Sequence, residues 1–291
     1  MGRRFFVPNQ KNIKTMKTLK TIWNKIPAWC KALIFMAVLG APVINIVQGT
    51  ALYNLQNNPG WGWGLLVAIP ILFLFWQLVS RWSPFKKPED VKISMRMNLK
   101  DSKVWSRMLG LILLTISMGV LVTELFDVNQ DYATTYFEAF KEVGDATAVP
   151  LLFAIAVTAG IVEEVIFRGY IQNTLVRVYP KTISFLAIGL VFALIHYLPL
   201  PLLVGFILIS VCFSLVADEF KSLGVVILAH ALVDIISLAG LYYGTSEETS
   251  PQGLAIAAIV FIVSLLLIFK DNKTLRFSSL KKLKLQTKVQ S

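Results

Sequence analysis

Residues 148–167, AVPLLFAIAVTAGIVEEVIF, form an apolar stretch with no ionisable residue before Glu163 and Glu164. A bilayer core about 30 Å thick is crossed by a helix of about 20 apolar residues. This stretch has that length, so we expect a transmembrane helix. Near its end, it brings two carboxyl groups to membrane depth.

Seven further apolar stretches accompany this one along the chain. The eight stretches cover residues 32–54, 61–80, 108–126, 148–167, 183–199, 202–217, 223–243 and 252–269. The chain is 56% hydrophobic and only 15% charged, whereas about a quarter of the residues of a soluble domain are charged. No internal repeat or separate soluble domain stands out. The sequence therefore predicts an all-α, polytopic membrane helix bundle with about eight transmembrane helices.

The charged residues stand in blocks between the apolar stretches. Residues 81–107, 168–181 and 270–288 are rich in Lys and Arg, whereas the alternate connections are acidic or neutral. The positive-inside rule then places both termini in the cytoplasm. We predict a basic cytoplasmic segment over 1–31, a membrane domain over 32–269 with its catalytic core at about 148–243, and a basic cytoplasmic tail over 270–291.

The net charge of +11 would indicate a nucleic-acid partner only if the cations formed one face of a soluble module. Because they flank apolar stretches instead, we expect membrane lipid as the partner and no nucleic acid. Cys30 and Cys212 have neither metal-site nor disulfide spacing. The short connections are typical of a bacterial cell-membrane protein, and the sequence leaves the oligomeric state open.

Ionisable side chains at membrane depth are costly and mark functional sites. In this chain they are concentrated in three stretches: Glu163 and Glu164 in one, His196 in the next, and His230 with Asp234 in the seventh. Taken alone, each group has a structural explanation, as an ion pair or an interhelical hydrogen bond. Their concentration on three helices favours a functional site.

The spacing of these residues assigns them different surroundings. Glu164 and Arg168 are four residues apart, so on a helix they form an ion pair on one face. Glu163 is rotated by about 100° from Glu164, which leaves it free to face a cavity. His230 and Asp234 are also four apart and can point into the same cavity, where Asp234 could orient His230.

A carboxylate beside two imidazoles can bind and deprotonate water, either directly or through a zinc ion. In the zinc case, the ligands would be His196, His230 and Glu163. The pattern thus predicts a hydrolase and leaves the need for zinc open.

Three motifs resemble the signature of the CAAX protease and bacteriocin-processing (CPBP, or Abi) family of intramembrane proteases, which includes type II CAAX prenyl endopeptidases. The motifs are Glu163-Glu164-x-x-x-Arg168, Phe192-x-x-x-His196 and His230-x-x-x-Asp234. The resemblance covers roughly residues 148–243. It implies an intramembrane endopeptidase, either a metalloprotease or a glutamate protease, that cleaves a hydrophobic peptide or a membrane-protein substrate.

The resemblance also implies roles for the site residues. Glu163 would activate water together with His196, and Glu164 would brace its helix through the ion pair. His230 and Asp234 would be metal ligands or a pair that stabilises the oxyanion. Many members carry Asn in place of Asp234, and an ionised Asp cannot donate a hydrogen bond. A metal-binding or histidine-orienting role, or a protonated Asp, is therefore favoured here.

A second hypothesis is a non-proteolytic protein, such as a bacteriocin self-immunity protein or a membrane regulator of a sensor kinase. It predicts that function survives Glu163→Ala. A transporter or proton relay could use the same buried groups, but it should show repeat symmetry, which the sequence lacks.

The depth of His196 is the difficulty in the predicted topology. At 1.5 Å per residue, His196 lies roughly 20 Å from the cytoplasmic start of its stretch, deeper than Glu163 and His230. Residues 198–201, Leu-Pro-Leu-Pro, interrupt the apolar run. We expect them to form a turn within the membrane, so that the fifth and sixth stretches make a shallow pair.

Overall fold

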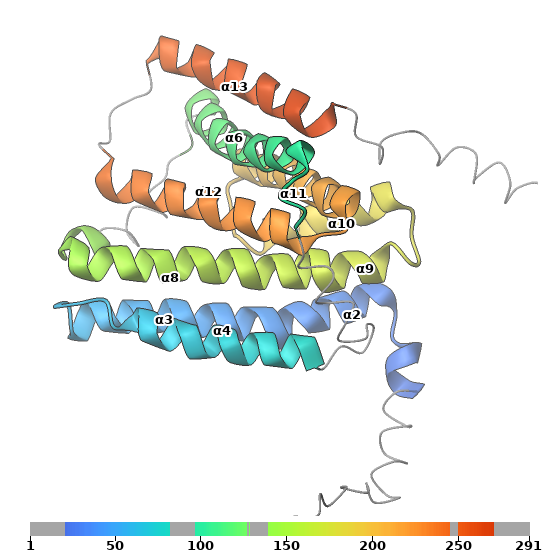
Figure 1. Ribbon diagram of the computed structural model, residues 1–291, viewed down its shortest axis with the longest axis horizontal. Coiled ribbons are helices and arrows are strands. Elements are labelled where there is room, and N and C mark those ends of the chain that lie inside the picture. Colours follow the sequence, from blue (N-terminus) through green and yellow to red (C-terminus); the bar gives the residue numbers. More distant parts are fainter. Residues whose placement is uncertain (1–20, 82–96, 127, 129–138, 245–249, 271–291) are drawn as a thin grey trace, which may run out of the picture.

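The computed structural model describes residues 21–81, 97–126, 128, 139–244 and 250–270, and in these ranges the protein is a bundle of helices without β-strands (Figure 1). The predicted all-α class is confirmed. The helices are α2 (Ala28–Phe35), the π-helix η1 (Met36–Gly40), α3 (Ala41–Asn57), α4 (Gly64–Arg81), α6 (Ser102–Leu125), α8 (Asp145–Glu164), the π-helix η2 (Val165–Ile171), α9 (Gln172–Leu175), α10 (Lys181–Leu194), α11 (Leu200–Phe220), α12 (Leu223–Tyr243) and α13 (Pro251–Phe269).

Six helical segments in the described part of the chain are long and apolar enough to cross a membrane. Two of them join several elements: Trp29–Asn57 runs through α2, η1 and α3, and Asp145–Leu175 runs through α8, η2 and α9. The apolar part of α4 and all of α10 are shorter. The predicted multi-pass bundle is therefore confirmed. In the described ranges it has six helices of spanning length and two shorter apolar ones, where the sequence predicted about eight transmembrane helices.

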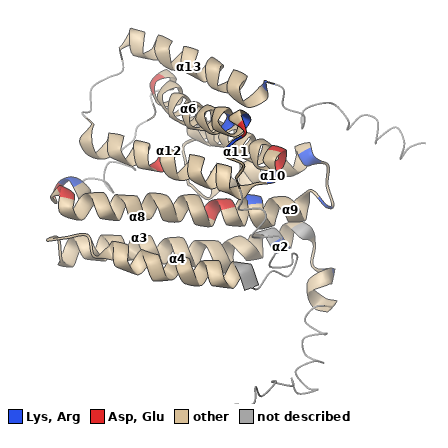
Figure 2. Ribbon diagram, viewed as in Figure 1, with Lys and Arg blue, Asp and Glu red and all other residues tan. Residues whose placement is uncertain are grey.

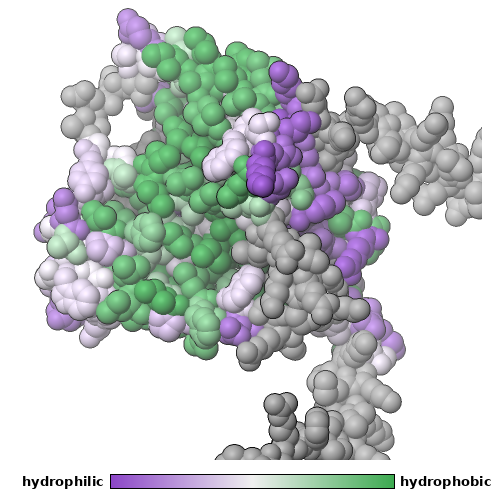
Figure 3. Space-filling view, viewed as in Figure 1, coloured by the Kyte–Doolittle hydropathy of each residue, from purple (hydrophilic) through white to green (hydrophobic). Residues whose placement is uncertain are grey.

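The helix α8 lies at the centre of the bundle, between α12 on one side and α3 with α4 on the other (Figure 1). Helices α6 and α13 pack together, and α10 packs against α11. Apolar residues cover the middle of the visible face (Figure 3), and most charged residues lie at helix ends (Figure 2). This distribution fits a protein surrounded by lipid.

The predicted basic segments lie largely outside the described residues, so their cytoplasmic placement stays a prediction. The predicted end of the fourth stretch at Phe167 is wrong, because the helix continues to Leu175. The sequence placed Arg168 at the start of a basic connection between two helices, but its side chain is buried. Both glutamates consequently lie inside a long helix. The π-helical turns of η2 follow Glu164 directly, and such turns are frequent at functional sites.

The predicted turn after the fifth stretch is present, slightly earlier than expected, and its depth in the membrane stays a prediction. Helix α10 ends at Leu194 rather than near residue 199, Tyr197 adopts a left-handed conformation with φ 52°, and α11 begins at Leu200. With 14 residues and 1.5 Å per residue, α10 is about 21 Å long. His196 thus lies in the turn between two helices that pack against each other.

Gly160 of α8 allows α12 to approach closely. A Cβ atom at Gly160 would lie 2.8 Å from the backbone nitrogen of Ala231 and 3.0 Å from its Cβ. Small residues allow such backbone contact between membrane helices. Because Ala231 follows His230, the contact also holds this histidine beside the glutamates of α8.

Gly160→Ala is expected to lower the free energy of unfolding by about 1–3 kcal/mol, because the added methyl group overpacks the α8–α12 contact. The matched control is Gly119→Ala in α6, where an added Cβ meets nothing within 4 Å among the described residues. There the better helix propensity of Ala should stabilise the protein by up to about 1 kcal/mol. Thermal unfolding in detergent measures both changes, and equal shifts in the two variants would contradict the explanation.

Candidate active site

The structure brings all five predicted acidic and imidazole residues together. Glu163 and Glu164 end α8, His196 lies in the α10–α11 turn, and His230 and Asp234 lie in α12. The Oε2 atom of Glu163 is 3.9 Å from Nε2 of His196 and 3.9 Å from Nε2 of His230. Asp234 Oδ2 is 3.5 Å from His230 Nε2. Glu163 therefore faces both histidines, as the spacing predicted.

Glu164 holds two partners rather than one. Its Oε1 atom accepts hydrogen bonds from Arg168 Nη1 at 2.9 Å and from His230 Nδ1 at 2.8 Å. The first contact is the predicted ion pair. The second was missed, because no local spacing relates two residues 66 positions apart. Glu164 is fully buried, so its charge depends on these two partners.

The Arg168 guanidinium is buried as well, and α11 supplies most of its other contacts. Its Nη2 atom donates to the Ser210 hydroxyl at 2.9 Å and to the Ser210 carbonyl at 3.2 Å. The guanidinium carbon lies 5.0 Å from the ring centre of Phe192 and 5.4 Å from that of Phe213, within the range of cation–π attraction. The sequence motifs missed Ser210 and Phe213, which have no motif spacing to Arg168.

Fixed hydrogen bonds orient both imidazole rings. His196 Nδ1 lies 2.6 Å from the Phe192 carbonyl oxygen, and because a carbonyl only accepts hydrogen bonds, Nδ1 must carry the proton. His230 Nδ1 similarly donates to Glu164. In both rings the Nε2 atom is then directed towards Glu163. The spacing of Phe192 and His196 thereby gains a physical reason, since the carbonyl one helical turn earlier sets the tautomer.

The predicted zinc ligands do not form a metal site as they stand. Three ligands at about 2.0–2.1 Å from one tetrahedral zinc ion would be about 3.4 Å apart, whereas Glu163 Oε2 is 3.9 Å from each imidazole nitrogen. No group of three His, Cys, Asp or Glu side chains in the described ranges could hold a metal ion. The sequence left the need for zinc open, and metal analysis of the wild type and of His196 and His230 variants decides between a metalloprotease and a glutamate protease.

The cluster lies within a stretch that matches a known family. Residues 145–236 match the family model described as type II CAAX prenyl endopeptidase Rce1-like. The Rce1-like region runs from the start of α8 into α12 and includes all the predicted site residues, so the expected resemblance is confirmed there. Comparisons with curated proteins and with solved structures gave no match.

Proposed function

We propose that this protein is an intramembrane endopeptidase in which Glu163 is the general base. The observation that carries the proposal is the position of Glu163 Oε2, 3.9 Å from Nε2 of both His196 and His230. At this separation, one water molecule can lie within hydrogen-bonding distance of all three groups. The match of residues 145–236 to an endopeptidase family supports the same chemistry.

In the proposed reaction, the water oxygen attacks the carbonyl carbon of the scissile peptide bond. Glu163 takes one water proton as the C–O bond forms, and the carbonyl electron pair moves onto oxygen. The second hydrogen stays on the water oxygen and donates a hydrogen bond to His196 Nε2, which so orients the attack. When the C–N bond breaks, Glu163 returns its proton to the leaving nitrogen.

His230 is the proposed donor to the developing oxyanion. Its ring lies between two carboxylates, with Nδ1 bonded to Glu164 and Nε2 3.5 Å from Asp234 Oδ2. These negative charges stabilise the imidazolium form, which can donate from Nε2. In this scheme, Glu164 and Arg168 are positioning residues, since they act through His230.

The proposed substrate is a membrane-associated or hydrophobic peptide, reached from the cytoplasmic side. The site is partly accessible, because the His196 side chain is 28% exposed and that of His230 is 13% exposed. Its surroundings are apolar helices of spanning length. A hydrophobic peptide that is already in the bilayer can therefore reach Glu163 without exposing its apolar side chains to water.

The test is cleavage of a hydrophobic peptide by wild-type protein, Glu163→Ala and His196→Ala in proteoliposomes. Cleavage should stop in both variants, and cleavage that survives in both contradicts the proposal. The same Glu163→Ala protein separates this proposal from the immunity or regulatory hypothesis, which expects protection or regulation to persist.

Asp234→Asn is expected to lower kcat by about tenfold. The amide keeps the shape of the side chain beside His230, and substitution of a residue that orients a functional histidine costs about 10–100-fold. The measurement is kcat for the hydrophobic peptide. The comparison variant is Asp234→Leu, which removes the polar group as well as the charge beside His230. A loss in Asp234→Asn as large as in Glu163→Gln would assign Asp234 a direct role in the reaction.

A further inference from the structure

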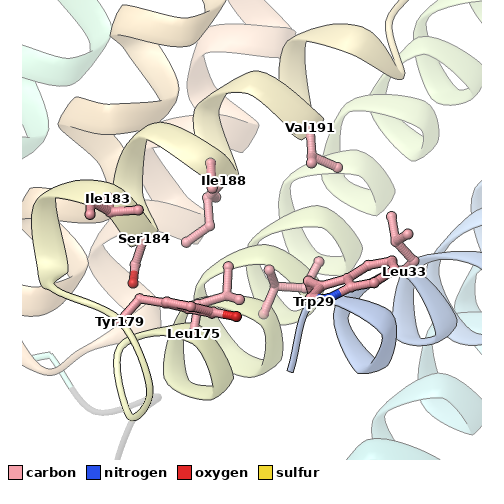
Figure 4. Close-up of a pocket in the computed structure, with 10 residues that line it drawn as sticks. Trp29, Leu33, Leu175, Tyr179, Ile183, Ser184, Ile188 and Val191 are labelled. Atoms are coloured by element: carbon pink, nitrogen blue, oxygen red, sulfur yellow. The ribbon is translucent and has the colours of Figure 1, made fainter. Parts of the chain in front are cut away.

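A groove lies between α2, α9 and α10, and no residue of the glutamate and histidine cluster lines it. It encloses about 330 Å³, which is at the lower limit for a small-molecule site. Figure 4 shows how α2 and α10 contribute its facing walls. Its lining is almost entirely apolar and includes Trp29, Leu33, Leu175, Tyr179, Ile188 and Val191.

One buried hydroxyl group in this groove makes no hydrogen bond to the described residues. Ser184 of α10 is 1% exposed, and its Oγ atom has no hydrogen-bond partner among the described residues. Figure 4 shows this oxygen directed towards the space between α10 and Tyr179. Buried polar atoms are normally satisfied, so a ligand that accepts a hydrogen bond here would remove the cost of the orphaned hydroxyl.

The chain segments that flank the groove are basic and carry aromatic residues. Residues 21–33 and 171–191, which contribute its lining, contain Lys25, Lys31, Arg177 and Lys181 and no acidic residue. Lys181 also pairs with Asp218 of α11 but stays half exposed. Trp29 is 55% exposed and Tyr179 is 39% exposed, as is typical of side chains at the membrane–water interface.

The polar and apolar features follow one another along α10. Lys181 precedes Ser184 by three residues, about 4.5 Å along the helix axis. Ile188 and Val191 continue on the same face at helical spacing. Cation, hydroxyl and apolar wall thus occur in the order of a phospholipid's phosphate, ester carbonyl and acyl chain.

We propose that this groove binds one anionic phospholipid, with an acyl chain between α2 and α10, an ester carbonyl on Ser184 and the phosphate near the cations of the two flanking segments. Each cation near a membrane surface contributes about 1 kcal/mol to the attraction of anionic lipid. The site does not use Glu163, His196 or His230, so the proposal is independent of proteolysis.

The experiment uses the full chain, extracted from vesicles of phosphatidylcholine mixed with phosphatidylglycerol, and counts the retained lipids by native mass spectrometry. Wild-type protein should retain phosphatidylglycerol in preference to phosphatidylcholine. Ala187→Phe, which fills the groove from α10, should abolish this preference. The matched control, Ala255→Phe at an exposed position of α13, should keep it.

Two further variants separate the contributions of charge and hydroxyl. Arg177→Gln should weaken retention of phosphatidylglycerol about fivefold, whereas Lys100→Gln, an exposed residue before α6, should not. Ser184→Val should weaken retention without lowering the unfolding midpoint in lipid-free detergent, because Ser184 Oγ bonds nothing there.

Two results would overturn the proposal. The first is equal retention of both lipids by the wild type, which would mean general lipid contact. The second is a phosphatidylglycerol preference that persists in Ala187→Phe. If this persistence is accompanied by a higher KM for the hydrophobic peptide, the groove is assigned to substrate.

Discussion

Glu163→Gln is expected to lower kcat for peptide cleavage by about 10²–10⁴-fold, the usual contribution of a general base. Glutamine keeps the shape of the side chain but cannot accept a proton from water. The fold should be unaffected, because Glu163 Oε2 makes no hydrogen bond in the described ranges. Single-turnover cleavage in proteoliposomes measures the loss, and the unfolding midpoint checks the fold.

The control for Glu163→Gln is the same change at Glu142, an exposed residue just before α8, which should leave kcat unaltered. Undiminished cleavage by Glu163→Gln would remove Glu163 from the mechanism. If the variant instead loses cleavage while a protective or regulatory activity of the protein persists, the immunity or regulatory hypothesis describes the physiological role better than proteolysis does.

Local patterns were sufficient to predict the features that depend on one helix. Apolar runs identified the membrane helices, because backbone groups in lipid must bond internally. The four-residue spacing of Glu164 and Arg168 predicted an ion pair that the structure contains at 2.9 Å. The concentration of ionisable groups on three helices indicated the site, since such groups are costly in the membrane.

Features that depend on contacts between helices were not accessible from these patterns. The fourth helix continues past Phe167 because Arg168 is buried, with Ser210 of α11 as an acceptor 42 residues away. The bond between His230 and Glu164 similarly follows from the packing of α8 on α12 at Gly160. In the sequence, Arg168 looks like the end of a membrane helix and Gly160 like an ordinary small residue. In the structure, both lie at contacts between helices.

The turn after α10 shows a third limit of the sequence. The two prolines of residues 198–201 predicted a break, but the backbone leaves the helix at Leu194, and Tyr197 adopts the left-handed region. Non-glycine residues rarely occupy that region, so no propensity pointed to Tyr197. The earlier turn places His196 on the turn itself, which lets it meet Glu163 from a short helix.

Arg168→Met is expected to lower the free energy of unfolding by about 3–5 kcal/mol, because it leaves the fully buried Glu164 with His230 as its remaining partner in the described part of the chain. This is the largest stability effect that we expect from a single substitution in the site. The control is Lys221→Met. The Lys221 side chain is 72% exposed, and its partner Asp218 keeps a second ion pair, with Lys181, when Lys221 is replaced. No carboxylate is then left without a cation, so the control should unfold within about 1 kcal/mol of the wild type.

Adding Glu164→Gln to Arg168→Met should restore most of the lost stability. The double variant has no uncompensated charge at this position, and the glutamine carbonyl can still accept the hydrogen bond from His230 Nδ1. Replacement of both members of a buried ion pair is often neutral or stabilising. If Arg168→Met instead destabilises the protein through lost packing contacts, a second substitution at Glu164 would not restore the stability. Thermal unfolding of the two variants in detergent decides between these causes. A double variant no more stable than Arg168→Met would show that the π-helical turns of η2 need Arg168 for its contacts with Ser210 and Phe192 rather than for its charge.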